Sequence, residues 1–306
     1  DGHLHWDVKA LFEALLNGLK KTLRQHPDLL SLGCDTWGID YVVLDDRDQL
    51  LGNPYCYRDP RTDGMMAKAF ALVPQKTIYA ETGIQFMPIN TLYQFLAARS
   101  GFGPPWKQAR HCLMMAEYFH FLFSGKKVAE ISLASTTQAW NPVTKQWSQR
   151  LLEKMGVPMN ILPPLVPPGT KLGPLLSEIA KKCGAKNPIQ VVVPCSHDTG
   201  SAVAAVPAEG KGWAYLSSGT WSLLGADLPA PRITDLGGEL GFTNEAGLDG
   251  TSRFLKNIVG LWIVQECRRF WEGKGTVYDY AALTRMAEEA KPFAALIDPD
   301  DDRFLK

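Results

Sequence analysis

A strand-to-helix turn within residues 189–206 constrains this chain more than any other feature. Residues 189–193, Ile-Gln-Val-Val-Val, are rich in β-branched side chains, which favours a buried strand. The polar residues 196–200 follow as a loop, and the small residues 201–206 predict a helix. Asp198 therefore stands where the strand ends and the helix begins, which is a common place for a catalytic carboxylate.

Two interpretations of Asp198 follow from this position. The free N–H groups at a helix start favour a negative charge nearby, so an ionised Asp198 could accept a proton from a substrate hydroxyl as a general base. Alternatively, the side chain simply caps the helix. The spacing of the residues leaves both interpretations open.

A second candidate is the segment 217–220, Ser-Ser-Gly-Thr, between the apolar runs 213–216 and 221–225. Glycine among small hydroxyl residues predicts a tight turn with open backbone N–H groups, which can bind phosphate oxygens. The alternative is an ordinary polar hairpin turn. The chain contains neither a P-loop pattern nor a Gly-x-Gly-x-x-Gly pattern after a strand, so neither of those nucleotide sites is expected.

The third candidate combines residues 35–40, Asp-Thr-Trp-Gly-Ile-Asp, with residues 57–62, Tyr-Arg-Asp-Pro-Arg-Thr. Trp37 offers a flat apolar face, and the Asp, Arg and Thr side chains offer directed hydrogen bonds. Sugars are bound by this mixture, because their rings have apolar faces and polar edges. The alternative is a core tryptophan beside a surface Arg–Asp pair.

Apolar spacing predicts the remaining organisation. The pattern indicates an amphipathic helix over 8–23, a strand over 29–34, a hairpin over 39–51, mostly helix over 64–165 including 112–123, and a helix over 175–183 that ends at Gly184. Proline, glycine and charge cluster at 207–212, where we expect a domain boundary.

Composition excludes several classes of protein. The 306 residues suggest about two domains, and 32 basic against 32 acidic side chains argue against a nucleic-acid partner. No apolar run approaches the ~18 residues of a membrane span, and the first residues do not resemble a signal peptide. Six scattered cysteines without a Cys-x-x-Cys pair indicate reduced thiols in the cytoplasm. We expect no structural metal, and we expect His3 and His5 to be solvated.

In chain order, several motifs resemble those of the FGGY carbohydrate kinases, and within them the kinases of the ketose L-rhamnulose. The motifs that carry the resemblance are 35–41 Asp-Thr-Trp-Gly-Ile-Asp-Tyr, 57–62 Tyr-Arg-Asp-Pro-Arg-Thr, 85–94 Gln-Phe-Met-Pro-Ile-Asn-Thr-Leu-Tyr-Gln, 132–137 Ser-Leu-Ala-Ser-Thr-Thr, 197–202 His-Asp-Thr-Gly-Ser-Ala, 216–222 Leu-Ser-Ser-Gly-Thr-Trp-Ser, and Asn244-Glu245 leading to Asn257 and Gln265. They span nearly the whole chain, and their joint order is specific although no single motif is decisive.

The resemblance implies an actin-like, ribonuclease H-like α/β fold of two domains with a cleft between them. The sugar-binding domain would cover 1–207, and the nucleotide-binding domain would begin at 208 and run to 306. Asp198 would be the catalytic base that takes the proton from the C1 hydroxyl of L-rhamnulose as this oxygen attacks the γ-phosphorus of ATP. ATP and Mg²⁺ would be the cofactors, with no nucleic acid or membrane partner.

The resemblance also assigns binding residues. The substrate-binding group would be Trp37, Gly38, His197, Thr199 and Asn257, and the ATP-binding group would be Gly219, Thr220 and Gln265. Asn257 and Gln265 are eight residues apart and would share one face of a helix over 256–270.

Compared with the family pattern, both ends of the chain are expected to be missing. The opening phosphate loop, a carboxylate that organises magnesium and the glycine-rich adenosine loop lie outside these residues, which predicts a fragment with weak or no activity. Alternatives are a kinase of another ketose or polyol (xylulose, fuculose or glycerol type) and a non-catalytic sugar-binding protein. A weaker alternative is a glycoside hydrolase that uses Asp40 and Asp198.

Overall fold

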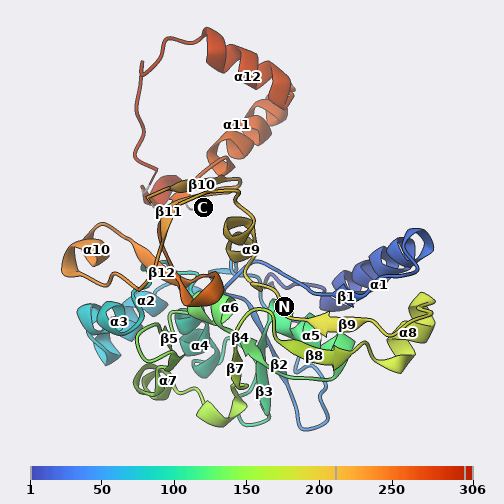
Figure 1. Ribbon diagram of the computed structural model, residues 1–306. Coiled ribbons are helices and arrows are strands. Elements are labelled where there is room, and N and C mark those ends of the chain that lie inside the picture. The colour runs from blue at the N-terminus through green and yellow to red at the C-terminus, as the bar shows by residue number, and fades with distance from the viewer. Residues whose placement is uncertain (1, 211, 300, 305–306) are drawn as a thin grey trace.

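The fold was analysed in a computed structural model that describes residues 2–210, 212–299 and 301–304. A large body of helices and short strands forms the lower part of Figure 1, and an antiparallel sheet with two helices stands above it. Helix α9 (Asp198–Ala204) lies between the two parts. The site described below depends on how these parts meet.

One side of the body is a three-stranded sheet covered by α1 (Val8–Gln25). The central strand β9 (Gln190–Val192) pairs in parallel with β1 (Ser31–Leu32) and antiparallel with β8 (Lys171–Pro174). Helix α1 begins because Asp7 accepts a hydrogen bond from the Ala10 amide at 3.0 Å, and its apolar stripe packs on this sheet. The predicted helix and both predicted strands are confirmed, although β1 has only two residues.

The predicted hairpin over 39–51 is only partly correct. Strand β2 (Tyr41–Leu44) turns back, and the Leu51 amide donates to the Val43 carbonyl at 2.9 Å. The main partner of β2 is the strand β3 (His111–Met114), a segment that the apolar pattern predicts to be helical. The apolar run is continuous there, so its periodicity does not mark the point where the strand ends and α5 (Met115–Ser124) begins.

The other helices of the body pack around α4 (Thr91–Arg99), whose residues Thr91 to Ala98 are all buried. A helix covered on all sides needs no amphipathic stripe. Around it lie the remaining elements of this region: α2 (Met65–Leu72), α3 (Gln75–Thr82), α6 (Ile131–Ser135), α7 (Gln149–Met155), the 3-10 turns Pro60–Thr62 and Met159–Ile161, and the two-stranded pairs β4 (Ala129–Glu130) with β7 (Leu165–Val166) and β5 (Trp140–Asn141) with β6 (Gln146–Trp147). Helix α8 (Ser177–Cys183) ends at Gly184, which has a φ of 79°, as predicted.

The upper sheet has the order β10-β11-β13-β12 and is antiparallel throughout. Its strands are β10 (Tyr215–Ser218), β11 (Trp221–Leu228), β12 (Thr243–Ala246) and β13 (Ser252–Val259). Strand β12 rests on the body, since the Ala246 amide donates to Ser135 Oγ at 2.9 Å. Helices α10 (Asp235–Glu239), α11 (Trp262–Gly273) and α12 (Tyr280–Glu289) complete this part, together with short 3-10 turns at Leu248–Gly250 and Asp302–Phe304.

The expected helix over 256–270 is correct only in its second part. Residues 252–259 form β13, and α11 begins only at Trp262. The predicted domain boundary at 207–212 falls in the connection between α9 and β10, and Lys211 lies outside the described residues. The division of the chain at 207 stays a prediction.

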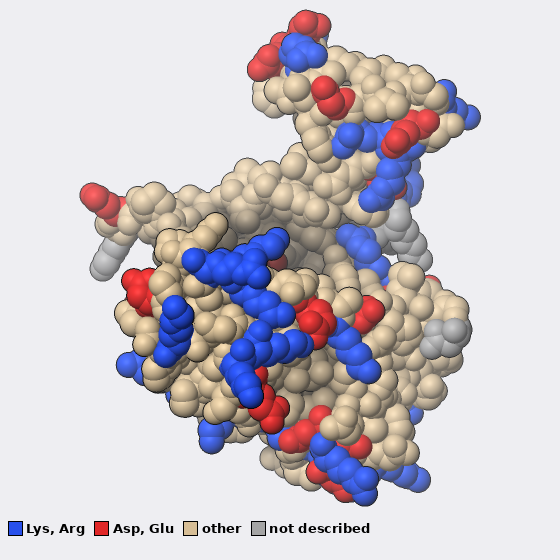
Figure 2. Space-filling view, turned by 90° about the vertical axis from the view of Figure 1, so that its right-hand side faces the viewer, with Lys and Arg blue, Asp and Glu red and all other residues tan. Residues whose placement is uncertain are grey.

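The surface between the two parts is hollowed (Figure 2). On the face that carries α1 and α8, Lys and Arg side chains are mixed with acidic ones, whereas few charges lie on the sheet above the hollow. In the described part of the chain, no helix combines the length and the apolar character that crossing a bilayer requires.

Candidate functional site

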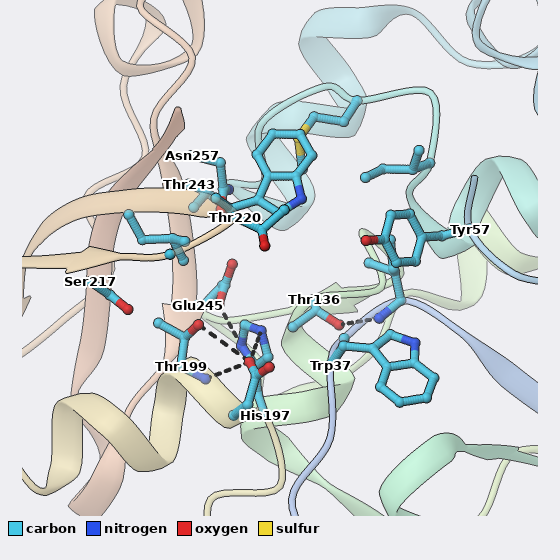
Figure 3. A pocket seen from close by; sticks show the side chains of 18 of the residues that line it. Trp37, Tyr57, Thr136, His197, Thr199, Ser217, Thr220, Thr243, Glu245 and Asn257 are labelled. Atoms are coloured by element: carbon cyan, nitrogen blue, oxygen red, sulfur yellow. Dashed lines mark hydrogen bonds and ion pairs between the residues drawn. The ribbon is translucent and has the colours of Figure 1, made fainter. Parts of the chain in front are cut away.

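A cavity of about 490 Å³ lies between the body and the upper sheet. Its walls come from five parts of the chain: the segment after β1, the loops before α4, the end of α6, the start of α9 and the inner face of the upper sheet. Figure 3 shows side chains from these segments pointing into the same space. The size is suited to a small polar metabolite.

Nearly all of the residues predicted from the sequence line this one cavity. They are Trp37, Gly38, His197, Asp198, Thr199, Gly219, Thr220 and Asn257. The structure therefore brings together all the predicted site residues except Gln265. Their roles in binding or catalysis stay predictions.

Gly38 allows the first wall to form. A Cβ atom at this position would lie 2.8 Å from Thr136 Oγ1, so no larger residue fits without movement of the backbone. The next residue, Ile39, has a φ of 65°, and its amide donates to Thr136 Oγ1 at 3.1 Å. This close turn holds the neighbouring Trp37 at the edge of the cavity, as Figure 3 shows.

Asp40 supports that wall from behind. Its Oδ2 atom accepts hydrogen bonds from the indole N–H groups of Trp6 and Trp37, at 2.7 and 3.0 Å, and from the Tyr57 amide at 3.1 Å. Gln94 donates to its other oxygen at 3.0 Å. Asp40 is fully buried and does not line the cavity, so it cannot pair with Asp198 across a sugar as the hydrolase interpretation requires. Burial raises the pKa of Asp40 to about 6.

Asp198 is the first residue of α9, and the N-cap position belongs to His197. The interpretation of Asp198 as a capping residue is therefore wrong by one position. Its Oδ1 atom accepts from the Thr199 amide at 2.6 Å, and 56% of its side chain is exposed. The other carboxylate oxygen has room to meet a ligand in the cavity.

His197 is surrounded by charged groups that the sequence did not assign to it. Its Nε2 atom lies 3.4 Å from Asp198 Oδ1, and its Nδ1 atom lies 3.1 Å from Arg253 Nη2 and 3.0 Å from Glu245 Oε2. Arg253 and Glu245 are both buried and form an ion pair, with 2.8 Å between Arg253 Nη2 and Glu245 Oε2. Although burial alone raises the pKa of Glu245, the nearby Arg253 and His197 outweigh it and hold the pKa at about 2. Glu245 belongs to the family motif Asn244-Glu245. The sequence marks Arg253 only as a charged residue within a run of strand-forming residues.

A second buried carboxylate holds the turn before α9 from the side of the body. Glu130 accepts from the Ser196 amide at 2.9 Å and from Ser132 Oγ at 2.5 Å, and Ser132 Oγ in turn accepts from the His197 amide at 3.3 Å. Burial raises the pKa of Glu130 and raises that of the adjacent Glu117 well above its usual range. No pattern in the amino-acid sequence indicated that Glu130 or Glu117 would be buried beside this turn.

The segment 217–220 forms a hairpin turn between β10 and β11, as predicted, but its backbone is less open than expected. The Gly219 amide donates to the Trp221 carbonyl at 2.8 Å. The Gly219 carbonyl accepts from the Leu261 amide at 2.9 Å, and the Thr220 carbonyl accepts from the Trp262 amide at 3.2 Å. Of the described backbone contacts none uses the Thr220 amide, so Thr220 offers both its amide and its hydroxyl to a ligand.

Asn257 and Gln265 do not share a helix face. Asn257 lies on β13, where its amide and side chain both donate to Gln85 Oε1, at 3.1 and 3.2 Å. Gln265 lies on α11, outside the residues that line the cavity. The strand-forming residues before the Gly260-Leu261 turn explain the error, because the turn ends the strand between the two positions.

No group of three metal-ligating side chains occurs among the described residues. The two N-terminal histidines, which were expected to be solvated, are half-buried and each contacts the loop 53–59. His3 Nδ1 lies 3.0 Å from Asp59 Oδ1, and His5 Nδ1 lies 3.0 Å from the Asn53 carbonyl oxygen.

Comparison with known proteins places the chain in a family. Residues 1–205 match the N-terminal domain of the FGGY family of carbohydrate kinases, and residues 214–306 match its C-terminal domain. The rhamnulokinase of Oceanobacillus iheyensis is 41% identical over 98% of this chain and 63% of its own length. That of Bacteroides thetaiotaomicron is 41% identical over 99% of this chain and 61% of its own length. The chain thus spans less than two thirds of the curated relatives it matches.

Solved structures share the fold at low sequence identity. A ligand-bound xylulose kinase from Lactobacillus acidophilus superposes with a TM-score of 0.82 at 19% identity, covering 95% of this chain and 59% of that one. The glycerol kinase of Plasmodium falciparum with ADP superposes with a TM-score of 0.78 at 15% identity, covering 97% of this chain and 62% of that one. The predicted two-domain sugar-kinase fold is confirmed by this likeness. The matches over both segments of the sequence show that the chain belongs to the FGGY family of carbohydrate kinases.

Proposed function

We propose that the protein is an ATP-dependent carbohydrate kinase that transfers a phosphoryl group to O1 of L-rhamnulose. The observation that carries the proposal is the shared cavity, which is lined both by the half-exposed Asp198 carboxylate and by the Ser217–Thr220 hairpin. The choice of sugar rests on the two rhamnulokinases that resemble the chain throughout.

In this proposal Asp198 acts as the general base. It takes the proton from the C1 hydroxyl while the C1 oxygen forms a bond to the γ-phosphorus of ATP, and the bond from that phosphorus to the bridging oxygen of ADP breaks. Phosphoryl transfer depends mainly on positioning and charge neutralisation. A half-exposed carboxylate that lines the cavity suits the role of proton acceptor.

The sugar would lie against the first wall. Trp37 supplies an apolar face, and Gly38 lets the sugar approach the backbone closely. His197, Thr199 and Asn257 would hydrogen-bond its hydroxyl groups. Figure 3 shows Trp37 and His197 on neighbouring sides of the same space.

The ATP phosphates would lie against the hairpin, with Thr220 donating from its free amide and hydroxyl. Gly219 supports this contact through the shape of the turn, because its amide is already used within the hairpin. A contact of Gln265 with ATP stays a prediction without support from the cavity. A divalent ion, Mg²⁺ by expectation, would neutralise phosphate charge when bound, but the described residues offer no three-ligand group for it.

The setting we infer is the cytoplasm. ATP is an intracellular substrate, and the six cysteines Cys34, Cys56, Cys112, Cys183, Cys195 and Cys267 are all free thiols.

A panel of ketoses and polyols tests the proposal. ADP release is measured with the protein in its full natural length, using L-rhamnulose, L-fuculose, D-xylulose and glycerol, and sugar binding is followed by calorimetry. We expect L-rhamnulose to give the highest kcat/KM. Turnover of another sugar alone would change the substrate, and sugar binding without ADP release would indicate a binding protein instead.

A further inference from the structure

The buried pair Arg253–Glu245 contacts the histidine next to the proposed base, and of the two only Glu245 lines the cavity. Arg253 extends from β13, and its Nε atom donates to the Ala246 carbonyl at 3.1 Å. Its Nη2 atom donates to Glu245 Oε2 at 2.8 Å and lies 3.1 Å from His197 Nδ1. Arg253 is only 1% exposed, so it has little freedom to adopt another geometry.

This contact selects one form of the His197 ring. A guanidinium group has only donors, so a hydrogen bond between Arg253 and Nδ1 requires Nδ1 to be the acceptor. In a neutral imidazole the proton then sits on Nε2. Nε2 lies 3.4 Å from Asp198 Oδ1, on the side of the cavity.

The other charged groups around the ring are Glu245 and Glu130. Glu245 Oε2 lies 3.0 Å from Nδ1 and favours a proton there, so it competes with the Arg253 donor for this ring nitrogen. Glu130 accepts a hydrogen bond from Ser132 Oγ, which in turn accepts one from the His197 amide. Glu130 therefore fixes the backbone of His197 and does not contact its ring. Arg253 and Glu245 together therefore determine which ring nitrogen carries the proton.

We propose that Arg253, held in place by Glu245, is a positioning residue that keeps His197 in its Nε2–H form, with this N–H directed at Asp198 and the cavity. The role rests on the proposed kinase function, because it matters for a base that must stay ionised beside a sugar hydroxyl. An N–H directed at Asp198 Oδ1 stabilises the carboxylate and leaves the other oxygen to accept the proton.

The arrangement also links the two parts of the molecule. His197 belongs to the segment that matches the N-terminal family domain, whereas Arg253 and Glu245 belong to the segment that matches the C-terminal one. The His197 ring is therefore set correctly only while β12 and β13 are seated on the body.

Nitrogen-15 NMR of labelled histidine tests the proposal without any need for turnover. The chain has 6 histidines, and the signals of His197 are assigned by their loss in His197→Gln. At about pH 8 we expect Nδ1 to give a pyridine-type signal and Nε2 a pyrrole-type signal. A pyrrole-type Nδ1 in the unmodified protein would overturn the proposal.

Two substitutions should have opposite results. In Arg253→Met, the donor to Nδ1 is lost and the Glu245 carboxylate remains beside it at 3.0 Å, so the Nδ1 signal should change to the pyrrole type. In Glu245→Gln, the arginine donor remains and the Nε2–H form should persist. The matched controls Arg285→Met and Glu288→Gln on the exposed helix α12 should leave the spectrum unchanged.

Identical spectra of Arg253→Met and the unmodified protein would show that Arg253 does not select the ring form. If Arg253→Met does not fold, Arg253→Lys, which keeps the charge and one donor, should retain the Nε2–H form, and loss of that form there would contradict the role. In the protein of full natural length, Arg253→Met should also lower kcat by about 10²-fold with the KM for ATP unchanged. A confirmed ring form in a protein that phosphorylates no sugar would refute the proposed function and leave the positioning of His197 intact.

Discussion

The indole rings of Trp6 and Trp37 lie 4.4 Å apart between their centroids, and both donate to the Asp40 carboxylate. Trp6 precedes the first helix, whereas Trp37 lines the cavity. One buried acid thus joins the N-terminal segment to the wall that we assign to the sugar.

The stability of the protein should depend on pH through Asp40. Its folded pKa of about 6 lies above the value of about 3.9 for an unfolded aspartate. Between these values the native state binds more protons, so Asp40 lowers the free energy of unfolding as pH rises from about 4 to about 6, by about 3 kcal/mol in total. The measurement is urea unfolding across this range for the unmodified protein and Asp40→Asn.

Asp40→Asn should be less stable at neutral pH, because its NH2 group must face either Gln94 or the two indoles, all of which are donors. It should also lack this part of the pH dependence. The control is Asp28→Asn, which changes an exposed aspartate. Parallel pH profiles for the unmodified protein and Asp40→Asn would show that Asp40 does not titrate in this range.

Asp198→Asn should abolish phosphoryl transfer in the protein of full natural length and leave sugar binding nearly unchanged. The amide keeps the shape of the side chain but cannot take the proton, and loss of a general base typically costs about 10²–10⁴ in rate. Initial rates and calorimetric sugar titration measure the two effects. Asp235→Asn is the matched control, because Asp235 is also the first residue of a helix and is exposed. Near-normal turnover in Asp198→Asn would remove the assignment of the base.

Thr220→Val should weaken ATP binding more than sugar binding. The change removes a hydroxyl donor at the hairpin and keeps the branched shape, so we expect a loss of about 1 kcal/mol, or about fivefold in the Kd for ATP. Calorimetry with each ligand measures the difference, and Thr284→Val on α12 is the control. An equal loss for both ligands would place Thr220 elsewhere than at the phosphates.

Gly38→Ala should damage the cavity, whereas Gly18→Ala should not. The new Cβ at Gly38 would lie 2.8 Å from Thr136 Oγ1, which predicts a destabilisation of about 1–3 kcal/mol and weaker sugar binding. Gly18 lies on the exposed face of α1, and no atom lies within 4 Å of the position that its Cβ would take. Because alanine favours a helix more than glycine does, Gly18→Ala should stabilise the protein by about 0.5–1 kcal/mol. Thermal unfolding compares the two, and an undamaged Gly38→Ala would show that the turn can relax.

Part of the fold could be predicted from local sequence alone. The apolar stripe of α1, the β-branched strand β9 and the turn between β10 and β11 depend on neighbouring residues, whose spacing is visible in the chain. The errors fell where an apolar run had no internal marker, as in the strand β3 before α5, or where a turn interrupted an apparent pattern, as between Asn257 and α11.

The sequence by itself determined the family motifs, the position of Asp198 at a strand-to-helix turn and the candidate residues of the cavity. Only the tertiary structure decided which charges surround His197, because Arg253 is 56 residues away along the chain. It also decided that Asp40 supports a wall and that Gln265 lies outside the cavity. The physical reason is that spacing reports interactions between near neighbours, whereas a buried charge is set by partners that only the packing of distant segments brings within hydrogen-bond distance.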